Sequence, residues 1–154
     1  MYFNTNMSNE NATSLPMSDA VKQILEISTT EANRLGSEIP TPPHVLYGLA
    51  ASQDSCMRKA KVEFGFCPLL VHLSLEKYRM LIAGNNPDQG VGKTLKTADA
   101  IARLAETDEI YSPALFISVL KSGGFVDLIM MDLGFQWNDE KRKWVKDPNS
   151  KMKY

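Results

Sequence analysis

The segment closest to a catalytic motif is Pro87-Asp88-Gln89-Gly90-Val91-Gly92-Lys93-Thr94, which ends in Gly-Lys-Thr as a phosphate-binding loop does. Such a loop needs glycine at the position of Pro87, because that glycine lets backbone N–H groups turn onto the phosphates. Proline has no N–H group to offer. The spacing therefore indicates a linker with a solvated lysine. A nucleotide-binding enzyme built around Lys93 and Thr94 is the alternative.

Residues that could bind a metal or act as nucleophiles are few. The chain has two histidines, His44 and His72, and two cysteines, Cys56 and Cys67. Cys67 and His72 are five residues apart, which places them poorly for joint coordination on a helix. A nucleophilic cysteine needs a neighbouring base, and the sequence gives neither thiol a supporting third group. We therefore expect no metal site, no cofactor and no catalytic residue, so that the protein is not an enzyme.

The bulk composition argues against several classes of function. The chain has 154 residues and a formal net charge of -1, so no overall field favours nucleic acid or an acidic membrane. The longest apolar runs, residues 67–73 and 125–131, are too short to span a bilayer. Residues 1–17 are polar and lack the apolar core of a signal peptide, which predicts a disordered tail. We expect a cytoplasmic protein without a nucleic-acid or membrane partner, and the oligomeric state stays open.

Helical patterns fill the first half of the chain after this tail. Apolar residues recur every three or four positions from Val21 to Leu35, and Gly36 is a typical helix stop. Proline is tolerated in the first turn of a helix, so Pro42 and Pro68 are each expected to open one. Four helices are predicted: from Ser18 or Asp19 to Gly36, from Pro42 to Ala51, from Asp54 or Ser55 to Gly65, and from Pro68 to Gly84.

The helical pattern starts again after residues 85–92, which hold several helix breakers and are predicted to form a linker. In the last of the new helices, Asn138 is expected to cap the start, with lysines near the end as the helix dipole favours. Residues 147–154 are predicted to form a polar C-terminal tail. The four helices of this half run through Leu95 to Ala105, from Ser112 to Leu120, from Phe125 to Leu133, and from Asn138 to Lys146.

The two halves can be overlaid on each other. At an offset of 70 residues Ala32 falls on Ala102 and Pro43 on Pro113, and at an offset of 69 Gly65-Phe66 falls on Gly134-Phe135. An ordered set of such matches over four helices is typical of an internal repeat. The sequence therefore predicts an all-α fold: a pseudo-twofold pair of four-helix repeats, eight helices in all, with repeat one at 18–84, a linker at 85–92 and repeat two at 93–146.

The same residues carry a family resemblance. A helix with Ala32, Leu35 and Gly36 is followed by Pro43-His44-Val45-Leu46-Tyr47-Gly48-Leu49 and by a third helix that ends in Gly-Phe. Residues 18–146 thereby resemble the Clp N-terminal domain (Clp repeat) family, the amino-terminal part of Clp AAA+ unfoldases, in which a four-helix motif occurs twice. The second helix of that motif begins with a Thr-Glu-His-Leu-Leu-like stretch. His44 stands at its histidine, and Ser112 stands at the capping threonine of the second copy.

The resemblance implies binding rather than catalysis. Clp N-terminal domains receive adaptor proteins, unfolded substrates or tagged proteins, and stand-alone versions exist without AAA+ ATPase modules. We therefore expect a non-enzymatic protein-binding module in protein quality control, with a Clp ATPase or protease component, an adaptor or an unfolded substrate as partner. Reuse of the Clp-N scaffold in a secretion or immunity system is a further alternative. The residues expected to contact the partner lie near the second helix of each repeat: Pro43, His44, Tyr47, Tyr111 and Pro113.

The sequence also departs from the family pattern at these helix starts. The family's glutamate after the capping threonine is replaced by Pro43 in the first copy and Pro113 in the second. In relatives that recognise phosphoarginine this glutamate pairs with the guanidinium group, a charge-assisted bond that proline cannot form. The capping threonine itself becomes Pro42 in the first copy, which is expected to remove a side-chain acceptor there. Binding at the two helix starts is therefore expected to be apolar.

Overall fold

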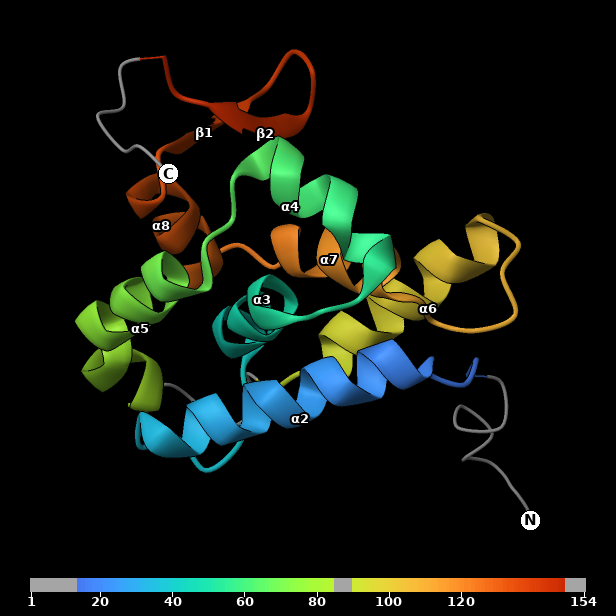
Figure 1. The fold of residues 1–154 in the computed structure, drawn as a ribbon, viewed down its shortest axis with the longest axis horizontal. Helices are drawn as coiled ribbons and strands as arrows, with labels where there is room; N and C mark the ends of the chain where they lie inside the picture. The colour runs from blue at the N-terminus through green and yellow to red at the C-terminus, as the bar shows by residue number, and fades with distance from the viewer. Residues whose placement is uncertain (1–13, 85–89, 149–154) are drawn as a thin grey trace.

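A computed structural model describes residues 14–84 and 90–148 of the chain, and these residues are mostly helical (Figure 1). They form seven α-helices, one short 3-10 helix and one two-stranded sheet. In chain order the elements are α2 (Asp19–Arg34), α3 (Pro42–Ala51), the 3-10 helix η1 (Ser55–Met57), α4 (Arg58–Phe64), α5 (Pro68–Ala83), α6 (Gly92–Leu104), α7 (Ser112–Leu120), α8 (Phe125–Asp132), β1 (Phe135–Asn138) and β2 (Lys143–Lys146).

Helices α3 and α7 form the centre of the molecule, and the other helices surround them (Figure 1). Both are short and apolar on nearly every side, as is typical of a buried helix. Leu46, Leu49 and Leu115 are fully buried, each contributing about 2 kcal/mol of hydrophobic free energy. Helix α2 packs along α3, and α6 packs along α7. Helices α5 and α8 pack against each other and against α3.

Local signals in the sequence explain where the helices begin and end. The hydroxyl of Ser18 accepts a hydrogen bond from the backbone N–H of Val21, 3.2 Å away, and so caps α2. Gly36 adopts φ +88°, which lets the chain leave this helix with the N–H of Ser37 bonded to the carbonyl of Ala32 at 2.8 Å. Asp54 caps η1 through the N–H of Cys56, as predicted.

Seven of the eight predicted helices are present among the described residues, and the eighth prediction is wrong. Residues 135–146 form an antiparallel hairpin instead of a helix capped by Asn138, so the fold is not strictly all-α. The side-chain oxygen of Asn138 does accept from the N–H of Lys141, at 2.8 Å, but within a turn. The same bond occurs in a helix cap and in an Asx turn, so the signal did not separate the two.

The hairpin is stabilised by aromatic side chains on one face. Trp137 lies opposite Trp144 in the register, with the ring centroids 5.9 Å apart and the planes at 74°. Phe135 is buried and lies edge-on to Phe66, which lies between α4 and α5. Trp144 is also buried, and such aromatic pairs contribute about 1 kcal/mol beyond the area they bury.

The predicted tails and linker are in part outside the described residues, which exclude 1–13, 85–89 and 149–154. At the N-terminal side, the backbone N–H of Leu15 donates to Asp99 at 2.8 Å, and Met17 pairs with Ile110 as an isolated parallel bridge. The N–H of Asp147 donates to the carbonyl of Gly134, also at 2.8 Å. The described ends of both predicted tails are therefore attached to the helical body. Gly92, assigned to the linker, is already the first residue of α6.

None of the described helices alone combines the length and the apolar character that a membrane crossing requires. Only α7 and α8 taken together meet this test, across a bend of 97°.

Candidate functional site

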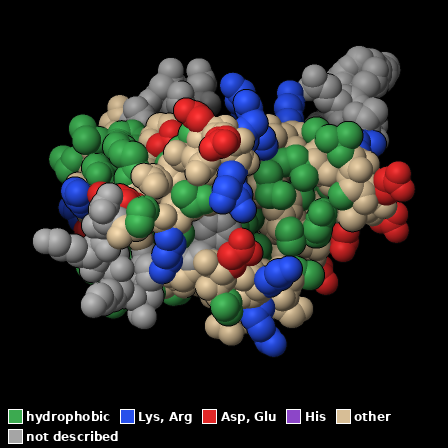
Figure 2. Space-filling view, turned by 90° about the horizontal axis from the view of Figure 1, so that it is seen from above, with side chains coloured by type: hydrophobic (Ala, Val, Ile, Leu, Met, Phe, Trp, Pro, Cys, Tyr) green, Lys and Arg blue, Asp and Glu red, His purple; other side chains and the backbone are tan. Residues whose placement is uncertain are grey.

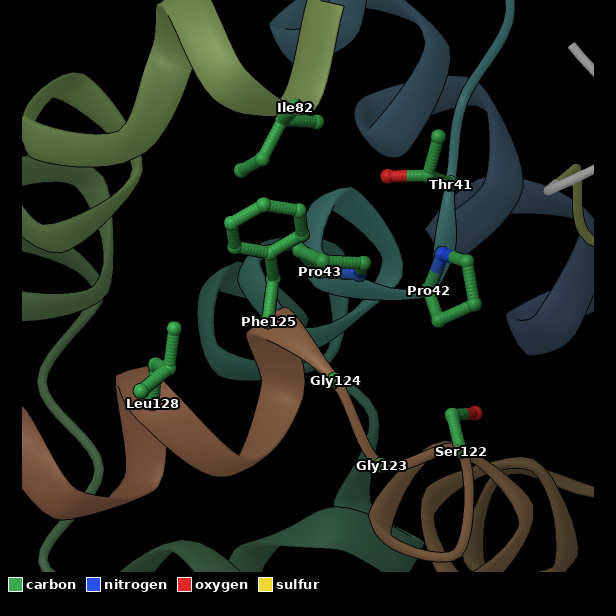
Figure 3. A pocket seen from close by; sticks show the side chains of 9 residues that line it. All are labelled: Thr41, Pro42, Pro43, Ile82, Ser122, Gly123, Gly124, Phe125 and Leu128. Carbon is green, nitrogen blue, oxygen red and sulfur yellow. The ribbon is translucent and has the colours of Figure 1, made fainter. Parts of the chain in front are cut away.

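An apolar hollow of about 320 Å³ lies where the start of α3, the end of α5 and the turn from α7 to α8 meet (Figure 3). In Figure 3 the ring of Phe125 lies between Ile82 of α5 and Pro43 of α3. Leu128, one turn further along α8, is 38% exposed. The hollow is lined by Thr41, Pro42, Pro43, Ile82, Ser122, Gly123, Gly124, Phe125 and Leu128.

Two glycines turn the chain so that α8 faces this hollow. Gly123 has φ +70° and Gly124 has φ +59° with ψ −128°, a conformation that residues with a Cβ rarely adopt. This turn produces the 97° bend between α7 and α8. Phe125 and Leu128 consequently face the end of α5 instead of continuing the line of α7.

The start of α3 forms another wall of the hollow, and its cap differs from the prediction. Thr41 is the N-cap residue, and its backbone N–H donates to Nδ1 of His44 at 3.0 Å. Thr41 Oγ1 lies 2.9 Å from the same ring nitrogen. The expectation that this helix start lacks a side-chain acceptor is therefore wrong, because the imidazole supplies one. Pro42 and Pro43 occupy the first turn, where a missing N–H costs nothing.

His44 acts as a neutral structural group in this cap. The side chain is 1% exposed, and burial lowers its pKa to about 4. The nearby charge of Glu31 opposes this change in pKa but does not reverse it. A neutral imidazole has one nitrogen free to accept, as the contact with the N–H of Thr41 requires.

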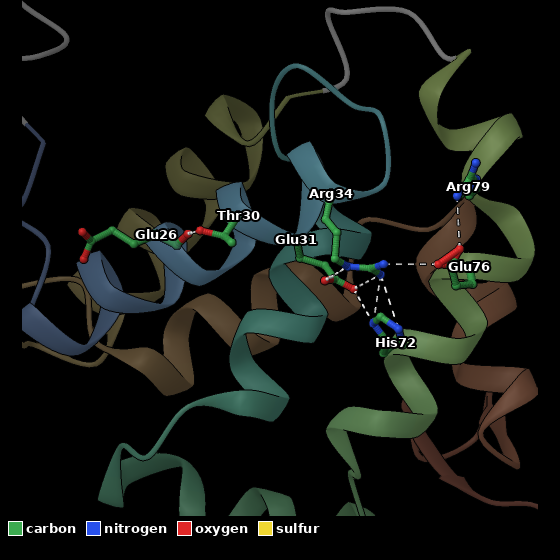
Figure 4. Close-up of polar contacts among 7 residues, drawn as sticks. All are labelled: Glu26, Thr30, Glu31, Arg34, His72, Glu76 and Arg79. Atoms are coloured by element: carbon green, nitrogen blue, oxygen red, sulfur yellow. Dashed lines mark hydrogen bonds and ion pairs between the residues drawn. The ribbon is translucent and has the colours of Figure 1, made fainter.

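A chain of polar contacts holds α5 against α2 and so positions Ile82 (Figure 4). Glu31 on α2 is 5% exposed and binds Arg34 through both carboxylate oxygens, at 3.0 and 3.2 Å. Its Oε2 lies 2.9 Å from Nδ1 of His72 on α5. Arg34 also reaches Glu76 at 3.4 Å, and Glu76 in turn contacts Arg79.

The charge of Glu31 is stabilised by these partners. Burial acts to raise the pKa of this carboxyl, but the hydrogen bonds from Arg34 and His72 outweigh burial and hold the pKa below its usual range. Glu31 is therefore an anion at neutral pH. Removal of Arg34 or His72 would leave the buried carboxylate with less compensation for its charge and so destabilise the folded state.

Contacts between α5 and α8 complete the frame of the hollow. The hydroxyl of Ser74 donates to Asp132 at 2.9 Å, and Lys77 lies 3.3 Å from the same carboxylate. Nearer to the hollow, the rings of Tyr78 and Phe125 lie with centroids 6.0 Å apart. The apolar walls are thus fixed by polar contacts on α2, α5 and α8.

A second hollow, of about 310 Å³, adjoins the first and is polar. It shares Pro42 and Ser122 with the apolar hollow, so the two hollows lie side by side. Two lysines, Lys93 and Lys121, stand on its walls. The remaining lining residues are Gly90, Thr94, Thr97 and Ser118. We refer to the apolar and polar hollows together as the α3–α8 groove.

The five residues predicted to contact a partner are not all brought together. Pro43 lines the α3–α8 groove, whereas His44 is buried behind it. Tyr47 lines a separate hollow of about 350 Å³ with residues of α2, and its ring centroid is 6.2 Å from that of His72. Tyr111 and Pro113 lie at the start of α7, outside the residues that line either part of the groove.

The start of α7 also differs in its cap from the prediction. Tyr111 is the N-cap residue, and Ser112, expected at the cap, is the first residue inside the helix. The hydroxyl of Ser112 donates to the carboxylate of Asp54, which links α7 to the cap of η1. The two helix starts therefore have different surroundings, and both parts of the α3–α8 groove are lined by residues at the first of the two.

Sequence reasoning missed the residues that form most of the groove. Ile82, Phe125 and Leu128 were interpreted only as helix positions. The signal that could have found them is Gly123-Gly124 directly before Phe125, because two glycines allow a sharp turn between two apolar helices. Phe125 and Leu128 lie beside the end of α5 because of contacts between segments that are far apart in the sequence. Local sequence patterns do not predict such contacts.

The other residues considered for chemistry lie apart from one another. Lys93 and Thr94 are in the first turn of α6, and Pro87 lies outside the described residues. The two strands in the described ranges form the hairpin and pair with each other only. Within those ranges no three His, Cys, Asp or Glu side chains are grouped to hold a metal ion. Cys56 and Cys67 are both free thiols.

Comparison with protein families found no family model that matches the chain. Comparison with curated proteins also found no match. The likeness to Clp N-terminal domains therefore rests on the residues of this chain alone.

Proposed function

We propose that this protein is a non-enzymatic module of the Clp N-terminal type that binds a segment of another protein in the α3–α8 groove. The observation that carries the proposal is the apolar hollow between Pro43, Ile82 and Phe125, which opens to solvent beside the half-exposed Leu128. A concave apolar site with a few polar groups at its edge is the usual form of a binding pocket.

The surface around the groove supports this proposal. Figure 2 shows hydrophobic side chains at the left end of the molecule, the end at which Figure 1 places α5 and α8, and a further group to the right of the centre. An accumulation of exposed apolar side chains commonly marks a protein interaction surface. The large apolar residues exposed on these two helices are Leu69, Leu73, Met80, Leu81, Leu128 and Met131.

Structural correspondences between the two halves support the proposed duplication. Gly36 and Glu106, 70 positions apart, both have a positive φ just after a long helix. In each case the backbone N–H of the following residue donates to the carbonyl of an alanine, which is Ala32 in the first half and Ala102 in the second. Gly65 and Gly134, 69 positions apart, both have a positive φ just before a buried phenylalanine. We infer that the chain arose from two copies of one unit whose last element has diverged into a hairpin.

A module of this kind would act by presenting or covering a docking surface. The proposed partners are a Clp ATPase or protease component, an adaptor, or an unfolded substrate segment in protein quality control. Binding would alter what the proteolytic machine accepts without any chemistry in this chain.

The test measures binding of a fluorescent, permanently unfolded polypeptide and of a purified Clp ATPase from the same organism. Leu128→Lys places a charge at the mouth of the apolar hollow and is expected to weaken binding at least tenfold, equivalent to about 1.4 kcal/mol. Leu104→Lys is the matched control, because Leu104 is 86% exposed at the end of α6 and does not line the groove. Binding that is absent in the unaltered protein, or equal in both variants, would contradict the proposal.

A further inference from the structure

The α3–α8 groove joins an apolar compartment to a basic one. Pro42 and Ser122 form the boundary and line both. On one side lie Ile82 and Phe125, and on the other lie Lys93 and Lys121. A ligand that fills both compartments must therefore place an apolar group and an anionic or strongly polar group next to each other.

The two lysines are available to such a ligand. Both are exposed, and neither ammonium forms an ion pair with a carboxylate of the described residues. Some other basic side chains are paired with carboxylates, as Lys77 is with Asp132 and Arg103 with Asp99. A pair of uncompensated cations on the walls of one hollow attracts a negative charge and disfavours a positive one.

The hydroxyl groups in the polar compartment are mostly directed into the protein. Ser118 donates to the carbonyl of Thr94 at 2.6 Å, and Thr97 donates to the carbonyl of Lys93 at 3.1 Å. Ser122 donates to the carbonyl of Ser118 at 3.3 Å. These groups help to shape the compartment and leave the lysine ammonium groups as its principal donors.

The direction of α6 adds to the positive potential. The helix has 13 residues and begins at Gly92, beside the polar compartment. Its N-cap residue is Val91, and no side chain of the described residues caps this helix start. The exposed N–H groups and the positive end of the helix dipole favour an anion there.

We propose that the segment bound in the α3–α8 groove carries an apolar side chain next to one or more aspartate or glutamate residues. The apolar side chain packs in the compartment of Ile82 and Phe125, and the carboxylate binds Lys93 and Lys121. This inference rests on the proposed function, since it specifies the chemistry of the partner segment. Apolar burial supplies affinity, and the two lysines select acidic segments over basic ones of equal hydrophobicity.

The experiment displays a library of random nine-residue peptides and selects on the full-length protein, with the Leu128→Lys variant selected in parallel. The expected result is enrichment of an apolar residue within two positions of Asp or Glu, and loss of that enrichment with Leu128→Lys. Enriched peptides are then synthesised with each acidic residue changed to glutamine. Their affinity is expected to fall at least tenfold, and to fall steeply with added salt.

A pair of charge variants gives a matched control. Lys93→Glu with Lys121→Glu reverses the charge of the polar compartment and is expected to abolish binding of the acidic peptide. It should leave the glutamine peptide within about twofold of its original affinity, which also shows that the variant is folded. Lys59→Glu with Lys141→Glu carries the same change in net charge at exposed lysines outside the groove, and should leave both affinities within about twofold.

The outcomes separate the two proposals. Peptides that are apolar, depend on Leu128 and show no acidic preference would overturn the present inference and leave the proposed function intact. Acidic peptides that bind equally well after reversal of Lys93 and Lys121 would also overturn it. A selection with no enrichment that depends on Leu128 would overturn the proposed function and this inference together.

Discussion

The crossing of α2 with α3 and the crossing of α6 with α7 differ in which helix carries a serine at the point of contact. In the first, Ser28 stands on the long helix and Gly48 on the short one, and in the second Ala98 and Ser118 occupy the positions 70 residues later. The hydroxyl of Ser28 donates to the carbonyl of Ile24 at 2.7 Å. The hydroxyl of Ser118 donates to the carbonyl of Thr94, the position 70 residues after Ile24, at 2.6 Å.

The difference shows that one hydroxymethyl group fills each crossing, whichever helix supplies it. A Cβ added at Gly48 would lie 2.6 Å from the carbonyl oxygen of Ile24 and would also collide with the hydroxyl of Ser28. In this crossing the backbone oxygen of Ile24 and the hydroxyl of Ser28 together restrict position 48 to glycine. Where the long helix carries alanine, the short helix can supply the serine. Each crossing is consequently expected to respond differently to the same substitution.

The largest effect is expected for Gly48→Ala. The new Cβ meets a backbone oxygen that cannot move without shifting α2, so the free energy of unfolding should fall by about 2–3 kcal/mol. Denaturation in urea measures this. The double variant Ser28→Ala with Gly48→Ser reproduces the second crossing, and should be at least about 1 kcal/mol more stable than the sum of its single changes. Strict additivity would show that the two positions do not share one space.

The next effect concerns the start of α3, where His44 stands and the second half has Ala114. The pKa of His44 is about 4 in the folded protein and about 6.5 in the unfolded chain, so the unfolded state binds more protons between these values. The stability that depends on the neutral, buried imidazole is fully present above about pH 6.5 and is lost as the pH falls toward 4. The free energy of unfolding should therefore fall by about 2 kcal/mol between about pH 7 and pH 5.

The variant His44→Gln tests this assignment, because glutamine keeps an acceptor for the N–H of Thr41 but does not titrate. Urea denaturation at a series of pH values measures the decrease in the free energy of unfolding as the pH falls. In His44→Gln the part of this decrease that is due to His44 should be absent. His44→Ala removes the acceptor as well and should be less stable than His44→Gln throughout the range. If the free energy of unfolding of His44→Gln falls as steeply with pH as that of the unaltered protein, the decrease is due to other titrating groups.

A smaller effect is expected at Ser118. The change Ser118→Ala removes the hydrogen bond between α7 and the carbonyl of Thr94, and should cost about 1 kcal/mol. Ser28→Ala removes a bond within a single helix turn, and alanine is the better helix former, so its net effect should stay within about 0.5 kcal/mol of zero. Equal losses in both variants, measured by thermal and urea denaturation, would contradict the difference between the two crossings.

The smallest effects are expected where the two long helices end. Gly36 has φ +88° with open space around its Cα, so Gly36→Ala introduces backbone strain alone and should cost about 1 kcal/mol. Glu106 has φ +59° at the equivalent position, so Glu106→Gly should relieve strain and raise stability by about 0.5 kcal/mol. Calorimetric melting of the two variants should therefore show shifts of opposite sign.

Much of the helical framework could be predicted from the sequence, because its boundaries depend on local chemistry. Pro42, Pro68 and Pro113 each lie in the first turn of a helix, and Gly36 and Gly65 follow helix ends with a positive φ. Each signal acts within a few residues, so one sequence is sufficient to read it. The apolar spacing of α2 likewise identified the buried positions Val21, Ile24 and Ala32.

The hairpin could not be distinguished from a helix by the same local rules. Asn138 makes the bond that a helix cap makes, and acidic residues follow it as they do in a helix. The choice is instead decided by the facing pair of Trp137 and Trp144 and by burial of Phe135 against Phe66. The α3–α8 groove depends in the same way on distant contacts: α5 is placed by Glu31 and His72, which are 41 residues apart.

The hairpin has a consequence for how this protein behaves at high concentration. A two-stranded sheet has both of its edges open, and an open edge is a template for pairing with a strand of another molecule. Here each strand is only four residues long, and β2 carries Lys143 and Lys146 at its two ends. Short strands with lysines repel an incoming copy of themselves and resist growth into fibrils. The last element of the fold thus disfavours aggregation through its own backbone while Phe135 and Trp144 stay in the core.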